Sequence, residues 1–392
     1  MIGVAKLDQW IFCFLSLYCL LFAISVPGAY FCMDAALLLL TVRLLRSRQG
    51  VRPDRTWLTL AGLFMLAMLA ASLQGYNMNK SLFTTWRVGY TMIAPCLLGA
   101  HVVKNTRQRQ LLLSFVGISM TIACVYEIDL GLLGKGLDGG FLGRLQLAGQ
   151  IILVLPLYVL GFVAGHWKRP FVKPILIALI AVTFVALVYS GIRGAWIAIG
   201  AVGICLLYIV PVRFSRKIAV TVALTVVLLG IVASQPVLTE KFITGVTMKS
   251  QSISERFLMW RSAWNMFADH PVLGVGPAAF GKLYVSQYFL PEASQQEHTH
   301  PHNIFVQTLA ETGIVGAATF ILLWSFTLYH LIGTARHPAA DFWQQAAPVA
   351  ICGWLVLGLT DNIMYWFPAS FQFLWFLAGA AWNTNGNSQM AE

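Results

Sequence analysis

The sequence predicts an all-α, polytopic membrane protein with about twelve transmembrane helices and one long helical loop on the outer side. Three observations predict this fold class. The chain of 392 residues is 58% hydrophobic and 10% charged, with a mean hydropathy of +0.73, which excludes an ordinary soluble domain. Its apolar runs are long enough to cross a bilayer of about 30 Å. These runs are continuously apolar, whereas the strands of a membrane barrel alternate apolar and polar residues.

The apolar runs give the order of the elements. The run from Phe171 to Val210 is long enough for two spans, and the segment Ser190-Gly-Ile-Arg-Gly194 divides it. We expect nine transmembrane helices within residues 1–234, a loop at 235–302, and three helices with a short tail within 303–392. The predicted spans lie near 10–27, 29–45, 56–74, 85–103, 110–127, 147–165, 170–190, 194–210, 216–234, 313–333, 342–361 and 364–382.

The basic residues predict the orientation. If the amino terminus is cytoplasmic, most of the 26 Lys and Arg residues fall in short inner loops, and the rest lie mainly in one long outer loop. The positive-inside rule therefore puts both termini in the cytoplasm and the 235–302 loop outside. The net charge of +11 reflects this topology rather than binding to nucleic acid. The predicted inner residues are Lys6, Arg43, Arg46, Arg48, Arg52, Arg55, Lys104, Arg107, Arg109, Lys168, Arg169, Lys173, Arg213, Arg216, Lys217 and Arg336.

The cysteines and short motifs exclude several classes of site. All seven cysteines lie in or beside apolar runs without a Cys-x-x-Cys pair, so neither a disulfide framework nor a thiolate metal site is expected. Walker, Gly-x-Ser-x-Gly, His-Glu-x-x-His and Asp-x-Asp motifs do not occur. The first span could pass for a signal peptide, but the spans after it favour an uncleaved anchor.

A polar stripe leads into the tenth predicted span. Pro301 predicts the start of a helix, because proline fits the first turn without losing a hydrogen bond. From that start Asn303, Gln307 and Glu311 recur every four residues and share one face. Polar residues entering a membrane are costly, so this stripe, with His302 at its head, marks a functional site or hydrogen bonds between helices.

Two arginines, Arg193 and Arg256, are candidate phosphate ligands. Arg193 is predicted at the tight outer turn between spans seven and eight, either as an interfacial anchor or as a guanidinium directed at phosphate oxygens. In the long loop, Ser252 to Glu255 reads as a capping box that starts a helix near Ile253.

On that loop helix, Arg256 shares a face with Trp260, Trp264 and Phe267, whereas Arg261 points elsewhere and is the weaker candidate. The aromatic face fits either packing on the protein or a helix that lies on the bilayer surface. Both interpretations stay open on the sequence alone.

These segments resemble the O-antigen ligase and polymerase superfamily of bacterial inner-membrane proteins. The resemblance covers roughly residues 190–316, and the twelve-span topology extends it over the chain. It is carried by Ser190-Gly-Ile-Arg-Gly-Ala-Trp196, by Glu255-Arg256 through His270-Pro-Val-Leu-Gly-Val-Gly-Pro-Ala-Ala-Phe280, and by His300-Pro-His-Asn303 through Glu311-Thr-Gly-Ile-Val-Gly316.

The resemblance implies transfer of a polysaccharide from undecaprenyl pyrophosphate to a sugar hydroxyl of the lipid A core, on the periplasmic face of the inner membrane. It implies an inverting glycosyltransferase that needs no metal or cofactor, since undecaprenyl pyrophosphate is the donor carrier. The compact length resembles the ligase more than the polymerases or the protein O-oligosaccharyltransferases. A flippase or transporter is a third class, and it predicts charges deep within several spans, which are absent here apart from Asp34.

The chemistry of such a reaction assigns expected roles. Arginine stays ionised and binds phosphate through two parallel hydrogen bonds, so Arg193 and Arg256 are expected to neutralise the pyrophosphate, with Arg261 and Arg87 in reserve. His302 is the expected general base, held neutral by a helix amino terminus whose N–H groups could also bind the pyrophosphate. Further substrate contacts are expected from His300, Asn303 and Gln307, and a zinc site made by His298, His300 and His302 is the alternative.

Overall fold

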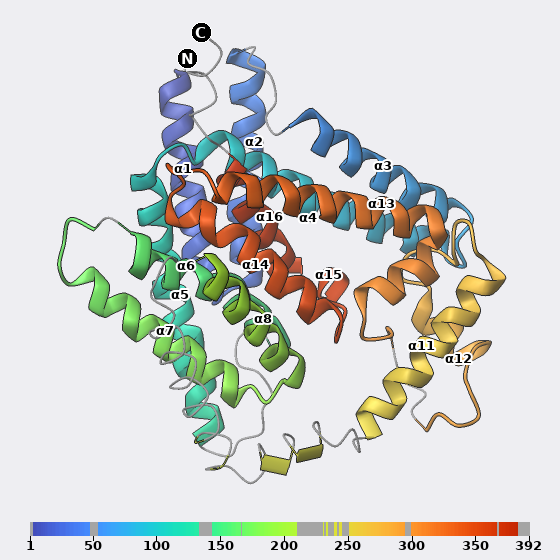
Figure 1. Cartoon of the computed structure of the whole chain (residues 1–392). Helices are drawn as coiled ribbons and strands as arrows, with labels where there is room; N and C mark the ends of the chain where they lie inside the picture. Colours follow the sequence, from blue (N-terminus) through green and yellow to red (C-terminus); the bar gives the residue numbers. More distant parts are fainter. Residues whose placement is uncertain are drawn as a thin grey trace.

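The computed structural model describes residues 3–47, 54–132, 143–165, 167–209, 251–294, 299–366 and 368–382, with a few residues between 230 and 244 (Figure 1). Every regular element in this described part is a helix, which confirms the predicted fold class. Among the described residues, seven helices are long and apolar enough to cross a membrane. They are α1 (Val4–Leu21), α2 (Val26–Ser47), α3 (Arg55–Leu73), α5 (Thr106–Leu132), α6 (Arg144–Ala164), α7 (Val172–Tyr189) and α13 (Ile304–Ala335).

The remaining helices complete the bundle and its loop. The predicted ninth span, 216–234, lies outside the described residues apart from Gly230 and Ala233, so the total number of spans stays a prediction. The division at residues 235 and 302 also stays a prediction. The other helices are α4 (Met78–Val102), α8 (Arg193–Ile209), α11 (Gln251–Asp269), α12 (Phe280–Ser286), α14 (Phe342–Gly358), α15 (Ile363–Trp366) and α16 (Pro368–Trp382).

Ion pairs gather several helix ends at one end of the bundle. Arg43 near the end of α2 lies 2.5 Å from Asp8 in α1, and Lys104 after α4 lies 3.4 Å from the same carboxylate. Arg109 in α5 lies 2.5 Å from Asp341, which caps α14, and donates to the carbonyl of Ala380 in α16. These helix ends were predicted to share one side of the membrane. The compartment that this side faces stays a prediction.

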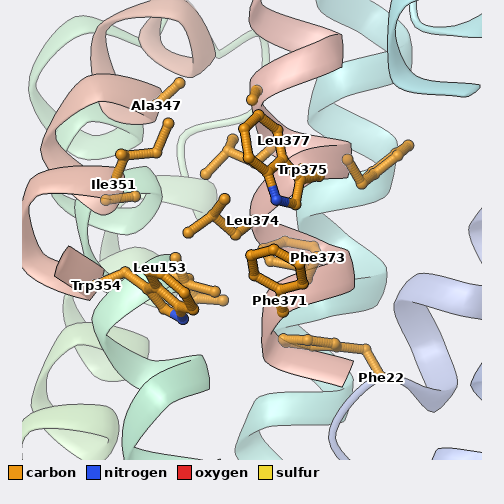
Figure 2. Packing of buried hydrophobic residues seen from close by; sticks show 14 of the residues in the cluster. Phe22, Leu153, Ala347, Ile351, Trp354, Phe371, Phe373, Leu374, Trp375 and Leu377 are labelled. Atoms are coloured by element: carbon orange, nitrogen blue, oxygen red, sulfur yellow. The ribbon is translucent and has the colours of Figure 1, made fainter. Parts of the chain in front are cut away.

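Helix α16 forms the centre of the bundle. Phe371 stacks on Trp354 of α14 with 5.4 Å between ring centroids, and Phe373 stacks on Phe22 at 4.3 Å (Figure 2). On another side α16 contacts α4 closely, since a Cβ at Gly379 would lie 2.0 Å from the carbonyl oxygen of Cys96. Small residues permit such close helix packing where lipid offers no hydrophobic drive for association.

A break in α13 fixes the long loop onto the bundle. Gly313 has φ 62°, so the regular helical bonds are interrupted there. The carbonyls of Ala310 and Glu311 accept instead from the N–H groups of Val275 and Gly276, at 3.1 and 2.9 Å. The N–H of Ile314 in turn donates to the carbonyl of Pro271 at 2.8 Å. The 271–276 segment therefore replaces one turn of helix bonding and holds α11 beside the start of α13.

Candidate active site

Three side chains meet between the start of α13 and the turn after α14. Nε2 of His300 lies 3.1 Å from Oδ1 of Asp361, and Nδ1 of His302 lies 3.3 Å from Oδ2. The two imidazole centroids are 4.3 Å apart. The side chain of His302 keeps 23% of its surface exposed and that of Asp361 11%, so the cluster is recessed but open to a ligand.

The start of α13 differs from the prediction. The helix begins at Ile304 rather than at Pro301, because Asn303 is the amino-terminal cap and its side chain accepts from the N–H groups of Phe305 and Val306. Asparagine is among the strongest caps, and it satisfies donors that were expected to bind the pyrophosphate. His302 precedes the cap with φ 50°, a left-handed conformation that costs energy outside glycine. It therefore lies both next to the start of the helix and beside the carboxylate of Asp361, at 3.3 Å.

The charges in the cluster follow from burial and contact. Burial lowers the pKa of the His300 imidazole, and His302 and Arg256 lower it further. Contact with Asp361 raises this pKa. Burial alone would raise the pKa of the Asp361 carboxyl, but hydrogen bonds from both imidazoles outweigh it and hold that pKa well below its ordinary value. At neutral pH the cluster therefore contains an ionised Asp361 and a neutral His300.

Two guanidinium groups stand near this cluster. Burial lowers the pKa of Arg256. The charge of Asp361 raises this pKa and the charge of Arg193 lowers it, so Asp361 and Arg193 both lie within electrostatic range of Arg256. Arginine remains ionised despite this shift. Arg193 begins α8 directly after a turn in which Gly191 has φ 62°, and this confirms the predicted turn. The structure thus brings together His300, His302, Arg193 and Arg256 from three separate regions of the sequence.

Glycine at position 194 allows this approach. A Cβ there would lie 2.0 Å from Oγ1 of Thr360 and 2.8 Å from its Cβ, so the first turn of α8 rests on the residue before Asp361. Thr360 therefore occupies the space beside Gly194.

Gly194→Ala is expected to lower the transfer rate about tenfold or more, because a displaced α8 moves Arg193 away from Arg256. The rate is measured on purified protein, and Gly200→Ala, on the same helix with nothing near its Cβ, is the matched control. Equal rates in the two variants would contradict this role.

The polar stripe forms one hydrogen-bonded network. Gln307 donates to Glu311 at 3.1 Å and accepts from the amide of Asn362, the residue after Asp361. Asn303 donates to the carbonyl of Leu359 at 3.2 Å. Of the two interpretations left open, hydrogen bonding between helices is therefore observed, and it positions the turn that carries Asp361.

Helix α11 corrects two expectations. It already includes Gln251, and Glu255 accepts from the N–H and hydroxyl of Ser294, at 2.9 and 2.5 Å, instead of closing a capping box. Its buried face packs on the protein through Met259, Ala263 and Met266, whereas Trp264 is 57% exposed.

The arginines of α11 lie in different surroundings. Trp260, one turn after Arg256, donates to the carbonyl of Pro301 at 2.8 Å, so this side of the helix faces the histidines. Arg261 instead lies 3.7 Å from Glu292, and the two side chains are 62% and 60% exposed. The structure does not bring Arg261 to the cluster.

Arg87 lines a separate open groove of about 870 Å³ between α4 and α12. Gln307 and Thr299 also line this groove, so it adjoins the histidine cluster. Arg87 is therefore placed beside the site but is not among the contacts of the cluster that the structure describes.

The cluster also has the composition of a metal site. Ligand atoms of His300, His302 and Asp361 lie within 4.8 Å of one another, and three such ligands with a water would suit zinc. The predicted third histidine, His298, lies outside the described residues. Arg256 opposes a cation here, since its positive charge lies within electrostatic range of Asp361.

Asp361 is a site residue that the sequence analysis did not predict. It ends the predicted span 342–361, although Thr360-Asp361-Asn362 is a polar interruption between two apolar runs. That interruption, opposite a polar stripe on another span, was the available signal.

Asp361→Asn is expected to lower turnover about 10- to 100-fold, because an amide cannot accept from both imidazoles and orient them. The measurement is the transfer rate, with Asp129→Asn, an exposed carboxylate in α5, as the control. A rate equal to that of the control variant would remove Asp361 from the site.

Comparison with known proteins places both histidines and both arginines in a segment that a family model matches. A family model described as O-Antigen ligase matches residues 176–321. No curated protein matches the chain. The matched segment holds α8, α11 and α12 and contains Arg193, Arg256, His300 and His302, whereas Asp361 lies beyond it. With its multiple apolar helices, this chain is a multi-pass membrane protein, and residues 176–321 of its 392 are similar to the O-antigen ligase family.

Proposed function

We propose that the protein is an O-antigen ligase of the bacterial inner membrane. It transfers an undecaprenyl-pyrophosphate-linked polysaccharide to a sugar hydroxyl of the lipid A core, on the periplasmic face, with both termini in the cytoplasm. The observation that carries this proposal is the recessed His302–Asp361 pair with Arg256 and Arg193 near it, within a segment of the O-antigen ligase family.

His302 is the proposed general base. Its Nδ1 faces Asp361, so the carboxylate favours the tautomer that carries its proton on Nδ1 and leaves Nε2 to accept one. Both nitrogens of His300 are already engaged, Nδ1 at 3.0 Å from Oγ1 of Thr299 and Nε2 at 3.1 Å from Asp361. His300 is therefore a positioning residue, and Asp361 stabilises the imidazolium that forms on His302.

The proposed reaction is a displacement at the anomeric carbon of the donor sugar. The acceptor hydroxyl oxygen forms a bond to the anomeric carbon and gives its proton to Nε2 of His302. The bond between that carbon and the pyrophosphate oxygen breaks, and the electron pair leaves with the pyrophosphate. Arg193 and Arg256 neutralise the developing charge, so the leaving group needs neither a metal nor an acid. The proton on His302 passes to water after release of the products.

The test is transfer in a purified system. Full-length protein is incubated with lipid-linked glycan and lipid A-core acceptor, with no nucleotide, and with or without a metal chelator. Product that forms in the presence of chelator supports the proposal. Loss of product in chelator, restored by zinc, would instead assign the His300, His302 and Asp361 cluster to a metal. Chain growth on the lipid-linked glycan without any transfer to the core would assign the protein to the polymerases.

A further inference from the structure

A groove beside the histidine cluster is lined by positively charged side chains. It is open, measures about 870 Å³, and lies between α4, α12 and the start of α13. Lys80 and Arg87 of α4 and Lys282 of α12 line it, and none of the described lining residues is acidic. Lys80 and Arg87 are seven residues apart on one helix, so both project from the same face.

None of these three cations forms an ion pair within the described part of the protein, although Glu311 lies within electrostatic range of Lys80. Lys80 and Lys282 are exposed, and no carboxylate of the described residues lies within salt-bridge distance of either lysine or of Arg87. The guanidinium of Arg87 instead lies 6.0 Å from the ring centroid of Phe83. A groove lined by one sign of charge concentrates ligands of the opposite sign.

The groove also presents apolar surface. Phe83, Tyr76 and Val285 line it, and each leaves half or more of its surface exposed. Trp86, on the turn of α4 after Phe83, is likewise 61% exposed. Cations next to exposed aromatic and aliphatic side chains fit an amphiphile with anionic groups better than a free anion.

The groove reaches the proposed reaction centre through two residues. Gln307, which lines the groove, accepts a hydrogen bond from Asn362, next to Asp361, and Thr299 precedes His300. Arg193 and Arg256 are not among the described lining residues. The chain therefore has two groups of cations that converge on one base. A displacement with inversion requires nucleophile and leaving group on opposite faces of the sugar, so two binding regions are needed.

We propose that this groove binds the phosphate groups of the acceptor glycolipid. Lys80, Arg87 and Lys282 hold phosphates of the lipid A portion and bring the core sugar toward His302, while Arg193 and Arg256 hold the pyrophosphate of the donor. This inference rests on the proposed function for the identity of the acceptor, and it makes Arg87 an acceptor ligand instead of a reserve ligand of the donor.

Direct binding tests the groove without any turnover. Full-length protein in a nonionic detergent is titrated with bisphosphorylated lipid A, with dephosphorylated lipid A, and with inorganic pyrophosphate. The variants are the double substitution Lys80→Ala with Lys282→Ala, and Lys168→Ala, an exposed lysine outside the groove, as the control. We expect the Kd for bisphosphorylated lipid A to rise about tenfold or more in the double variant and to stay unchanged in the control.

The dephosphorylated lipid is expected to bind more weakly to wild-type protein and equally to both variants. An unchanged Kd for bisphosphorylated lipid A in the double variant overturns the proposal. A double variant that loses binding of inorganic pyrophosphate instead also overturns it, since the groove then belongs to the donor. Because this assay needs no catalysis, selective loss of lipid A binding would support the groove even if the transfer assay failed.

Discussion

His302→Ala is expected to lower turnover by about 10²–10⁴, the range that a positioned general base contributes. Without the imidazole the acceptor hydroxyl must lose its proton to water, while the binding groups for both substrates remain. The loss is therefore expected in kcat, with little change in the KM for the acceptor. The measurement is the rate of transfer to lipid A-core under saturating lipid-linked glycan.

Two comparisons make this result specific. His337→Ala removes an exposed histidine from the turn between α13 and α14 and is expected to leave the rate unchanged. The side chain of His302 is 23% exposed, so its removal is expected to leave the thermal unfolding midpoint in detergent close to that of wild type. A His302→Ala enzyme that turns over at the normal rate would eliminate His302 as the base.

Glu311→Ala is expected to release the long loop from the bundle. The carboxylate accepts from the N–H of Ala278 at 2.9 Å, from the N–H of Phe280 at 3.1 Å, and from Gln307. It is fully buried, so its loss leaves these donors without partners, at about 1–3 kcal/mol for each. The 274–280 turn would detach, and Arg256 on α11 would move with it.

Limited proteolysis measures this release. Cleavage within residues 270–290 is expected to accelerate in Glu311→Ala, and the thermal midpoint in detergent is expected to fall. Glu292→Ala is the matched control, because this exposed glutamate forms only a surface ion pair at 3.7 Å, worth about 0–1 kcal/mol. Proteolysis of Glu311→Ala at the rate of the control would show that other contacts hold the loop.

The sequence predicted some parts of the site correctly and others incorrectly. Arg193 was correctly placed at a turn, because a glycine-flanked arginine inside a long apolar run admits few other positions. The start of α13 was wrong by three residues, because Pro301 and Asn303 are both start signals and the asparagine cap prevailed. The aromatic face of α11 was ambiguous between protein and bilayer. The structure shows that a different face of the helix, with Met259 and Met266, packs on the protein and that Trp264 is exposed.

The sequence by itself determined the class of the protein. Hydropathy and basic loops suffice for an all-helical membrane bundle, since the bilayer requires every backbone group of a span to be bonded within a helix. The tertiary structure alone decided which polar residues meet. Asp361 reaches the histidines because Gly194 admits Thr360 and because Gln307 bonds Asn362. These contacts join residues more than fifty positions apart and depend on helix packing, which periodicity along one chain segment does not encode.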